Sequence, residues 1–298
     1  MHRRPALLDA PSNLGLRPPT PGAVPGCYKL PGALRDCGLQ RRLNAVDAGC
    51  VTPPRYDRGE WQEGDGVFNA AAMATYTVSL ADRVGALLHD DQFPIILGGD
   101  CSILLGTTLA LARRGRYGLV FIDGHDDFRH AGNSSKIGAA AGEDLALVTG
   151  RGQADLTDIE GRRPYVRDSD VVVVGVRDAD PNQGELDDLG IPVWNVSRIR
   201  QEGAAVIADA VIAHLERAEL EGFWVHLDAD VLDSHVMPAV DSPDPGGLEH
   251  EELVALLDPL LAAPSCAGLQ VTIFDPDLDP DGRLARDLTD TLIASLRD

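Results

Sequence analysis

Short apolar runs alternate along this chain with longer segments of helical periodicity. In those longer segments, apolar residues recur every three or four positions, over 70–88, 103–113, 205–220 and 251–261. This alternation is typical of βαβ units, in which helices connect parallel strands. It predicts an α/β fold with a mostly parallel sheet. The runs that we predict to be strands are PALLDA, FPIILGGD, GLVFIDGH, VVVVGVRD, IPVWNV, FWVHLDAD and GLQVTIFD.

Chemically distinctive sequences follow several of the predicted strands. Parallel sheets bind ligands beyond the carboxyl ends of their strands, which is where GGDCS, DGHDD, VRDAD and DADVLD stand. The segments 11–25 and 132–142 are predicted to be long loops over the sheet edge, and long ordered loops are often functional. No repeat and no linker divides the 298 residues, so we expect a single domain over 1–298.

The composition narrows the class of protein. Hydrophobic residues make up 44% of the chain, which is enough for a large core. The 47 acidic residues exceed the 26 lysines and arginines, and the formal net charge of −21 disfavours nucleic acid as a partner. Neither a membrane-spanning run nor a signal-peptide pattern is evident, so we expect a cytoplasmic protein without a membrane partner. The five cysteines include no CxxC pair, which argues against a disulfide framework or a structural zinc site.

Residue types that ligate metals stand at alternate positions after two of the predicted strands. Alternate side chains of an extended chain point the same way, so these groups are expected to converge where the strands end. Clustered carboxylates need an opposing charge, which divalent cations supply, and the pattern indicates a two-metal hydrolase. Capping or surface aspartates are the plainer alternative. The residues are Asp123, His125, Asp127, Asp228 and Asp230.

Four motifs in register resemble one known family. GGDCS, DGHDD, HLDADVLD and PAVDSPDPGGL are similar to the patterns GGDHS, DAHxD, SxDxDxxDP and PxxGTPxxGG of the arginase/agmatinase (ureohydrolase) family, and weaker similarity extends over nearly the whole chain. The resemblance implies a three-layer αβα sandwich with a mostly parallel sheet of about eight strands. It also implies two divalent metal ions, most commonly Mn²⁺, a small guanidino substrate, and a homo-oligomer that is a trimer or a hexamer.

Carried over residue by residue, the resemblance assigns the metal ligands. Asp123 and Asp228 would bridge the two metals, Asp127 would ligate the first, and His125 and Asp230 would ligate the second. A hydroxide held between the metals would attack the guanidine or amidine carbon. Asp127 would hydrogen-bond this hydroxide and pass its proton to the leaving amine, so that urea and an amine are released.

One ligand position departs from the family pattern. Cys101 stands where the family has a histidine, and a thiolate there would favour Zn²⁺, Fe²⁺ or Ni²⁺ over Mn²⁺. Packing of a small buried thiol is the other interpretation, and both stay open. The neighbouring Asp100 also has two interpretations. It orients the metal ligands without binding the metal itself, or it caps the helix that begins at Ser102.

Two histidine positions differ from the family as well. Ala141 aligns with the histidine thought to shuttle protons in arginases. His130 and Lys136 are candidates to replace it, although solvated loop residues are the commoner outcome. His226 replaces a serine before the aspartates and is interpreted either as a satisfied core histidine or as a further group behind the ligands.

Ile273 aligns with the glutamate that arginases use to recognise the guanidinium group of the substrate. Asp275, Asp277 and Glu143 are candidates to supply a carboxylate instead. Without such a partner, arginine itself is a doubtful substrate. For Asp277, a turn that caps the last helix is the alternative interpretation.

Two residues indicate a substrate with amino-acid-like ends. Arg129 stands where arginases have an asparagine near the α-carboxylate and is predicted to contact a carboxylate, and Asp180 resembles the residue that meets the α-amino group. Ion pairs within the loops are the alternative interpretation of both. We therefore expect hydrolysis of a C–N bond in an arginine-like or agmatine-like compound. The alternatives are a formiminoglutamase-like or other amidine hydrolase, a deacetylase on a related fold, and a degenerate member with a regulatory or assembly role. A deacetylase-like enzyme would carry paired histidines before the DxH motif, and this sequence has none.

Overall fold

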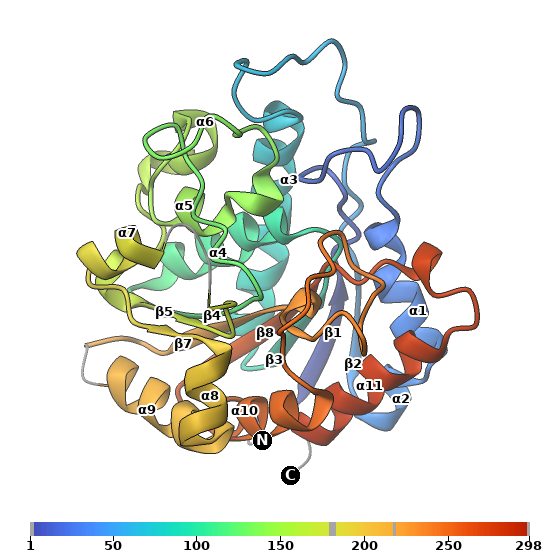
Figure 1. The fold of residues 1–298 in the computed structure, drawn as a ribbon, viewed down its shortest axis with the longest axis vertical. Helices are drawn as coiled ribbons and strands as arrows, with labels where there is room; N and C mark the ends of the chain where they lie inside the picture. Colours follow the sequence, from blue (N-terminus) through green and yellow to red (C-terminus); the bar gives the residue numbers. More distant parts are fainter. Residues whose placement is uncertain (1–2, 179–182, 217–218, 297–298) are drawn as a thin grey trace.

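An eight-stranded parallel sheet forms the centre of the molecule (Figure 1). The computed structural model describes residues 3–178, 183–216 and 219–296. The strand order is β2-β1-β3-β8-β7-β4-β5-β6, and every neighbouring pair is parallel. The strands are β1 (Pro5–Asp9), β2 (Val46–Cys50), β3 (Phe93–Leu97), β4 (Gly118–Ile122), β5 (Val171–Val174), β6 (Val193–Trp194), β7 (Phe223–Asp228) and β8 (Cys266–Thr272).

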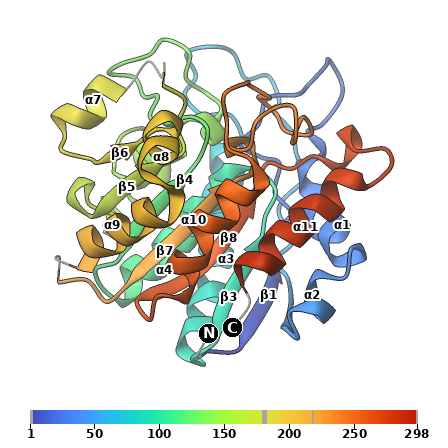
Figure 2. The same cartoon turned by 60° about the horizontal axis from the view of Figure 1, so that its bottom comes forward.

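Helices cover both faces of the sheet, which confirms the three-layer αβα sandwich (Figure 2). Neighbouring strand residues such as Ile95 and Ile96 belong to separate apolar clusters, as the alternation of side chains along a strand requires. On one face α3 packs on α4 and α6, and on the other α10 packs between α9 and α11. The helices are α1 (Leu30–Asp36), α2 (Leu39–Arg42), α3 (Ala70–His89), α4 (Leu104–Arg114), α5 (Asp144–Val148), α6 (Ala154–Thr157), α7 (Gln183–Asp188), α8 (Val196–Glu202), α9 (Ala204–Glu216), α10 (His250–Ala262) and α11 (Arg283–Ser295).

The apolar pattern located most of these elements. All seven predicted strands are present, and the four predicted helices coincide with α3, α4, α9 and α10 to within a few residues. The pattern does not predict β2, because this edge strand is largely exposed and reads VDAGC, without an apolar run. None of the helices in the described residues has both the length and the apolar character needed to cross a bilayer.

The carboxyl end of β3 and the loop after β1 approach each other closely. The Asp100 backbone N–H donates to the carbonyl of Ser12 over 3.0 Å. A Cβ atom on Gly99 would lie 1.6 Å from that same Ser12 oxygen, so this strand exit requires glycine. The contact ties loop 11–25 to the carboxyl end of β3.

Candidate metal centre and substrate pocket

Four of the five ligand residues predicted at β4 and β7 converge where these strands end, namely Asp123, His125, Asp228 and Asp230, whereas Asp127 belongs to neither of the two side-chain groups described below. Each strand tip curls so that an aspartate accepts a backbone N–H two residues ahead: His125 N–H donates to Asp123 Oδ1 and Asp230 N–H donates to Asp228 Oδ1, both over 2.7 Å. His125 Nδ1 lies 3.0 Å from Asp230 Oδ2. Two groups of side chains among the described residues could each hold a metal ion. Within each group, one ligand atom from every residue lies within 4.8 Å of the ligand atoms of the other residues, and Asp123 belongs to both groups. They are Asp123, His125 and Asp230, and Cys101, Asp123, His226 and Asp228.

The electrostatics of this centre favour a bound cation. Burial raises the pKa of Asp123 well above its usual value, and the charges of Asp230, Asp127 and Asp228 raise it further. Burial and the charge of Asp230 likewise raise the pKa of Asp228. Burial would lower the pKa of His125, but Asp230 outweighs it and raises that pKa to about 10. A divalent cation among these groups would reverse the repulsion between the carboxylates.

Hydrogen bonding gives independent support for a metal site. Asp123 Oδ2 is buried without a hydrogen-bond partner among the described residues, which is costly unless a cation occupies the position. Cys101 is fully buried, and its Sγ lies 2.7 Å from Asp228 Oδ2. Burial, followed by the charge of Asp228, raises the pKa of Cys101, so without metal it is a thiol. Oxygen, nitrogen and sulfur donors at these positions fit two first-row divalent metals.

His226 is held in a single tautomer by its neighbours. The indole Nε1–H of Trp224 can only donate, and it donates to Gln270 Oε1 over 3.2 Å. The Gln270 amide nitrogen therefore faces His226 Nδ1, at 2.7 Å, so Nδ1 accepts. Burial lowers the pKa of His226 to about 3, so the ring is neutral and carries its proton on Nε2.

The Nε2 proton of His226 points toward two carboxylates. Nε2 lies 3.9 Å from Asp123 Oδ2 and 4.0 Å from Asp144 Oδ2. Within the part of the chain that the structure describes, none of these three buried atoms has a hydrogen-bond partner. The geometry favours His226 as a residue that orients the metal ligands rather than as a core histidine whose hydrogen bonds are all made. In this tautomer it donates and does not ligate.

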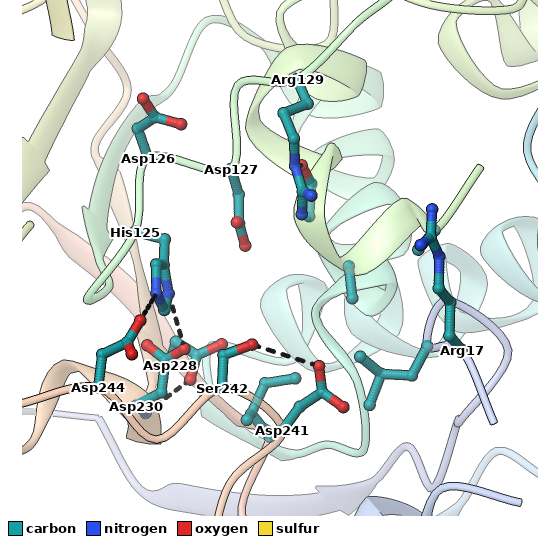
Figure 3. Close-up of a pocket in the computed structure, with 15 residues that line it drawn as sticks. Arg17, His125, Asp126, Asp127, Arg129, Asp228, Asp230, Asp241, Ser242 and Asp244 are labelled. Atoms are coloured by element: carbon teal, nitrogen blue, oxygen red, sulfur yellow. Dashed lines mark hydrogen bonds and ion pairs between the residues drawn. The ribbon is translucent and has the colours of Figure 1, made fainter. Parts of the chain in front are cut away.

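A cavity of 430 Å³ opens beside this centre. Its volume suits a ligand of amino-acid size. Asp228 and Asp230 lie at its base, and Arg129 and Arg17 line other parts of it (Figure 3). Loop 233–247 supplies Asp241, Ser242 and Asp244 to the lining, while Leu16, Ala139, Ala141, Gly142 and Ile273 come from loops 11–25 and 132–142 and from the segment after β8.

Comparison with known proteins identifies the family. The model of the Arginase family matches residues 21–296. An arginase of Brevibacillus brevis is 34% identical over 265 residues, which cover 86% of this chain and 87% of that protein. The chain belongs to the arginase family.

Solved structures of arginase-family proteins share the whole fold. The arginase of Bacillus caldovelox matches with a TM-score of 0.88 at 26% identity, over 99% of both chains. The formimidoylglutamase of Bacillus subtilis matches with a TM-score of 0.76 at 21% identity, over 99% of this chain and 86% of that one, which shows the common fold alone. The present chain is accordingly an arginase-family hydrolase with a cluster that can hold metal.

The structure brings some of the residues inferred from the arginase family to the pocket. Asp127 lines it, at a backbone φ of 43° in the turn after β4. Arg129 lines it too, anchored by a 3.1 Å hydrogen bond from Nε to the Gly142 carbonyl. Ala141 and Ile273 also stand in the lining, where arginases would have histidine and glutamate.

Other predicted residues have different contacts. Asp100 is buried outside the pocket lining and accepts from Ser102 N–H at 2.9 Å and Ser12 Oγ at 2.8 Å, which is the capping role. It therefore positions Cys101. Asp275 accepts the backbone N–H groups of Gly26 and Asp277 at 3.0 and 2.9 Å and does not line the pocket.

Four further candidates also lie outside the pocket lining, namely Asp277, His130, Glu143 and Lys136. Asp277 binds Lys29, and His130 pairs with Glu185 at 2.9 Å. Glu143 accepts the Gly138 N–H, and burial raises its pKa to about 7. Lys136 is exposed. Asp180 lies outside the described residues.

Sequence reasoning missed five polar residues of the pocket lining, namely Arg17, Asp126, Asp241, Ser242 and Asp244. Asp244 Oδ2 lies 3.2 Å from His125 Nε2 and extends the chain of contacts that begins at Asp230. The signal for Asp241 was present, because the motif PAVDSPDPGGL carries an aspartate there in place of the glycine of the family pattern PxxGTPxxGG, whereas Asp244 falls at a position that the pattern leaves unspecified. Arg17 had no such signal, since it lies in a loop whose path depends on the contact with Gly99.

Proposed function

We propose that this arginase-family hydrolase cleaves a C–N bond in a guanidino or amidine compound that carries a carboxylate. The observation that carries the proposal is the charge distribution of the pocket. Metal-ligand carboxylates lie at its base, whereas Arg129 and Arg17 line it elsewhere. A substrate with an amidinium group at one end and a carboxylate at the other matches this distribution.

We assign Asp123 and Asp228 to both metal sites, as the family resemblance implies; among the described side chains, Asp123 belongs to both groups and Asp228 to the group with Cys101. Cys101 and Asp127 would complete the first site, and His125 and Asp230 the second. When bound, two divalent metal ions would supply an activated water and neutralise the developing negative charge. Mn²⁺ is the metal that we expect, with a softer metal as the alternative at the Cys101 site.

Asp127 takes the acid and base role in this proposal. Its carboxylate accepts a proton from the attacking water and delivers it to the departing amine nitrogen as the C–N bond breaks. A guanidine carbon retains two nitrogens and leaves as urea, whereas a formimino carbon leaves as formamide. Arg129 holds the substrate carboxylate, and Asp100 keeps Cys101 in place through the cap.

A substrate panel tests the proposal. Protein loaded with Mn²⁺ or Zn²⁺ is incubated with L-arginine, agmatine, 4-guanidinobutyrate and formiminoglutamate, and urea, formamide and acetate from an acetylated control are measured. We expect turnover of a carboxylated amidine, lost in Asp127→Asn. Acetate release, or no metal-dependent turnover with any substrate, would overturn the proposal and favour the deacetylase or the non-catalytic interpretation.

A formiminoglutamase-like activity is the second candidate. Its substrate has two carboxylates, and both Arg129 and Arg17 line the pocket. Agmatine is disfavoured because it has no carboxylate to pair with either arginine. The cytoplasmic location and the trimer or hexamer remain predictions.

A further inference from the structure

We propose that Asp241 is the carboxylate that binds the cationic end of the substrate. The inference rests on the proposed function, because it concerns how an amidinium or guanidinium group is recognised. Such a group presents two parallel N–H donors, which a single carboxylate can accept together. Asp241 stands in the pocket lining beside Ser242, across from Arg129 (Figure 3).

Three other carboxylates of the pocket already have strong partners. Asp228 accepts from Cys101 and from the Asp230 backbone. Asp230 contacts His125 at 3.0 Å and Gly124 N–H at 3.1 Å. Asp244 contacts the other nitrogen of the His125 ring.

Asp241, in contrast, makes one weak contact. Among the described residues, Ser242 Oγ donates a hydrogen bond to Asp241 Oδ2 over 3.5 Å, which is the outer limit for such a bond. The side chain stays accessible from solvent through the pocket. Partial desolvation by the surrounding protein nevertheless raises the pKa of Asp241, and the charges of Asp230 and Asp275 raise it further. A cation placed against it would relieve that unfavourable environment.

A backbone hydrogen bond ties the loop that carries Asp241 to the segment that carries Ile273, the apolar residue at the position of the arginase glutamate. Asp275 N–H donates to the Ala239 carbonyl over 2.8 Å and ties the loop to the segment after β8. In that segment Ile273, at a φ of 73°, lines the same pocket. Leu16 adds a second apolar surface, and apolar surroundings strengthen a charge-assisted pair. The two ends of the substrate are then held by Asp241 and Arg129.

The test combines binding with turnover. The probe is acetamidinium chloride, titrated into the metal-loaded full chain and followed by NMR chemical shifts, alongside kcat and KM for the best amidine substrate. We expect Asp241→Asn to weaken probe binding and lower kcat/KM by roughly 10- to 100-fold, with metal content and Tm unchanged. Asp241→Glu, which keeps the charge, should recover part of both. Asp277→Asn is the matched control, because that carboxylate pairs with Lys29 outside the pocket lining. Its loss should change neither probe binding nor kcat/KM.

The outcomes separate this inference from the proposed function. Turnover by wild type with unaltered binding and kcat/KM in Asp241→Asn overturns the role of Asp241 and leaves the proposed function standing. Probe binding that depends on Asp241, without turnover of any amidine, supports the cation subsite and overturns the proposed function. No probe binding and no turnover overturn both. Loss of metal from Asp241→Asn also overturns the inference, because the residue would then serve the metal centre.

Discussion

The Sγ atom of Cys101 lies 2.7 Å from Oδ2 of Asp228, and this contact joins the ends of two strands that are far apart in the sequence. Cys101 follows β3, and Asp228 is the last residue of β7. In the metal-free protein the thiol donates to the carboxylate. A metal ion would replace that proton and bind both atoms, so the contact marks the position where a thiolate can enter the first metal site.

Replacing Cys101 should change which metal the first site prefers. We expect Cys101→His to bind Mn²⁺ more tightly and Cys101→Ala to lose affinity for Zn²⁺ and Co²⁺, because a soft thiolate ligand is removed in both. Sulfur-to-metal charge-transfer absorption after Co²⁺ loading provides the measurement. Wild type should show the near-ultraviolet band and both variants should lack it. Identical spectra in all three proteins would exclude Cys101 as a ligand.

Metal removal should destabilise the protein because the buried carboxylates then repel one another. Chelation followed by dialysis should lower Tm, and metal at about 100 times its Kd should restore about 2.7 kcal/mol per site, or roughly 5 °C or more. Asp123→Asn separates the repulsion between carboxylates in the metal-free protein from the stabilisation by bound metal. It removes one buried charge, so the apo variant should be at least as stable as apo wild type while its response to metal is small. A full metal-induced rise in the variant would contradict the central position of Asp123.

The sequence predicted the sheet and the ligand groups because both depend on local patterns. Val171–Val174 is a buried β-branched run, and the aspartates at the ends of β4 and β7 come together because these two parallel strands are neighbours in the sheet. The roles of single residues depend on distant contacts. The tautomer of His226 is set by Gln270, 44 residues away in the chain. The inferred role of Asp241 follows from a loop tied to the segment after β8, and no local pattern encodes that pairing.

The tautomer of His226 can be observed directly. Long-range ¹H–¹⁵N correlation of the apo protein should show protonated Nε2 and unprotonated Nδ1, and the ring should stay neutral down to about pH 4 because burial lowers its pKa to about 3. Gln270→Glu offers an acceptor where the amide N–H donated, so it should move the proton to Nδ1 or charge the ring. Gln270→Leu, which only removes the partner, should not charge the ring. A protonated Nδ1 in wild type would refute the arrangement of Trp224, Gln270 and His226.

Acid should weaken the anchor of the loop that carries Asp241. Asp233 accepts the backbone N–H groups of His235, Gly246 and Gly247 at 3.0, 2.6 and 3.1 Å. Burial would raise the pKa of Asp233, but the hydrogen bonds from His235 and Gly246 outweigh it and lower that pKa to about 2.

The sign of the pH effect follows from this lowered pKa. Because the unfolded value is about 3.9, the stabilisation is fully present above about pH 4 and is lost as the pH falls toward 2. Asp233→Asn should therefore have a lower free energy of unfolding than wild type at pH 5, and the gap should narrow toward pH 2 in urea titrations. Asp187→Asn, an exposed substitution of the same kind, corrects for the loss of one charge. A gap between wild type and Asp233→Asn that stays constant from pH 5 to pH 2 would mean that the ionised carboxylate of Asp233 does not hold the loop.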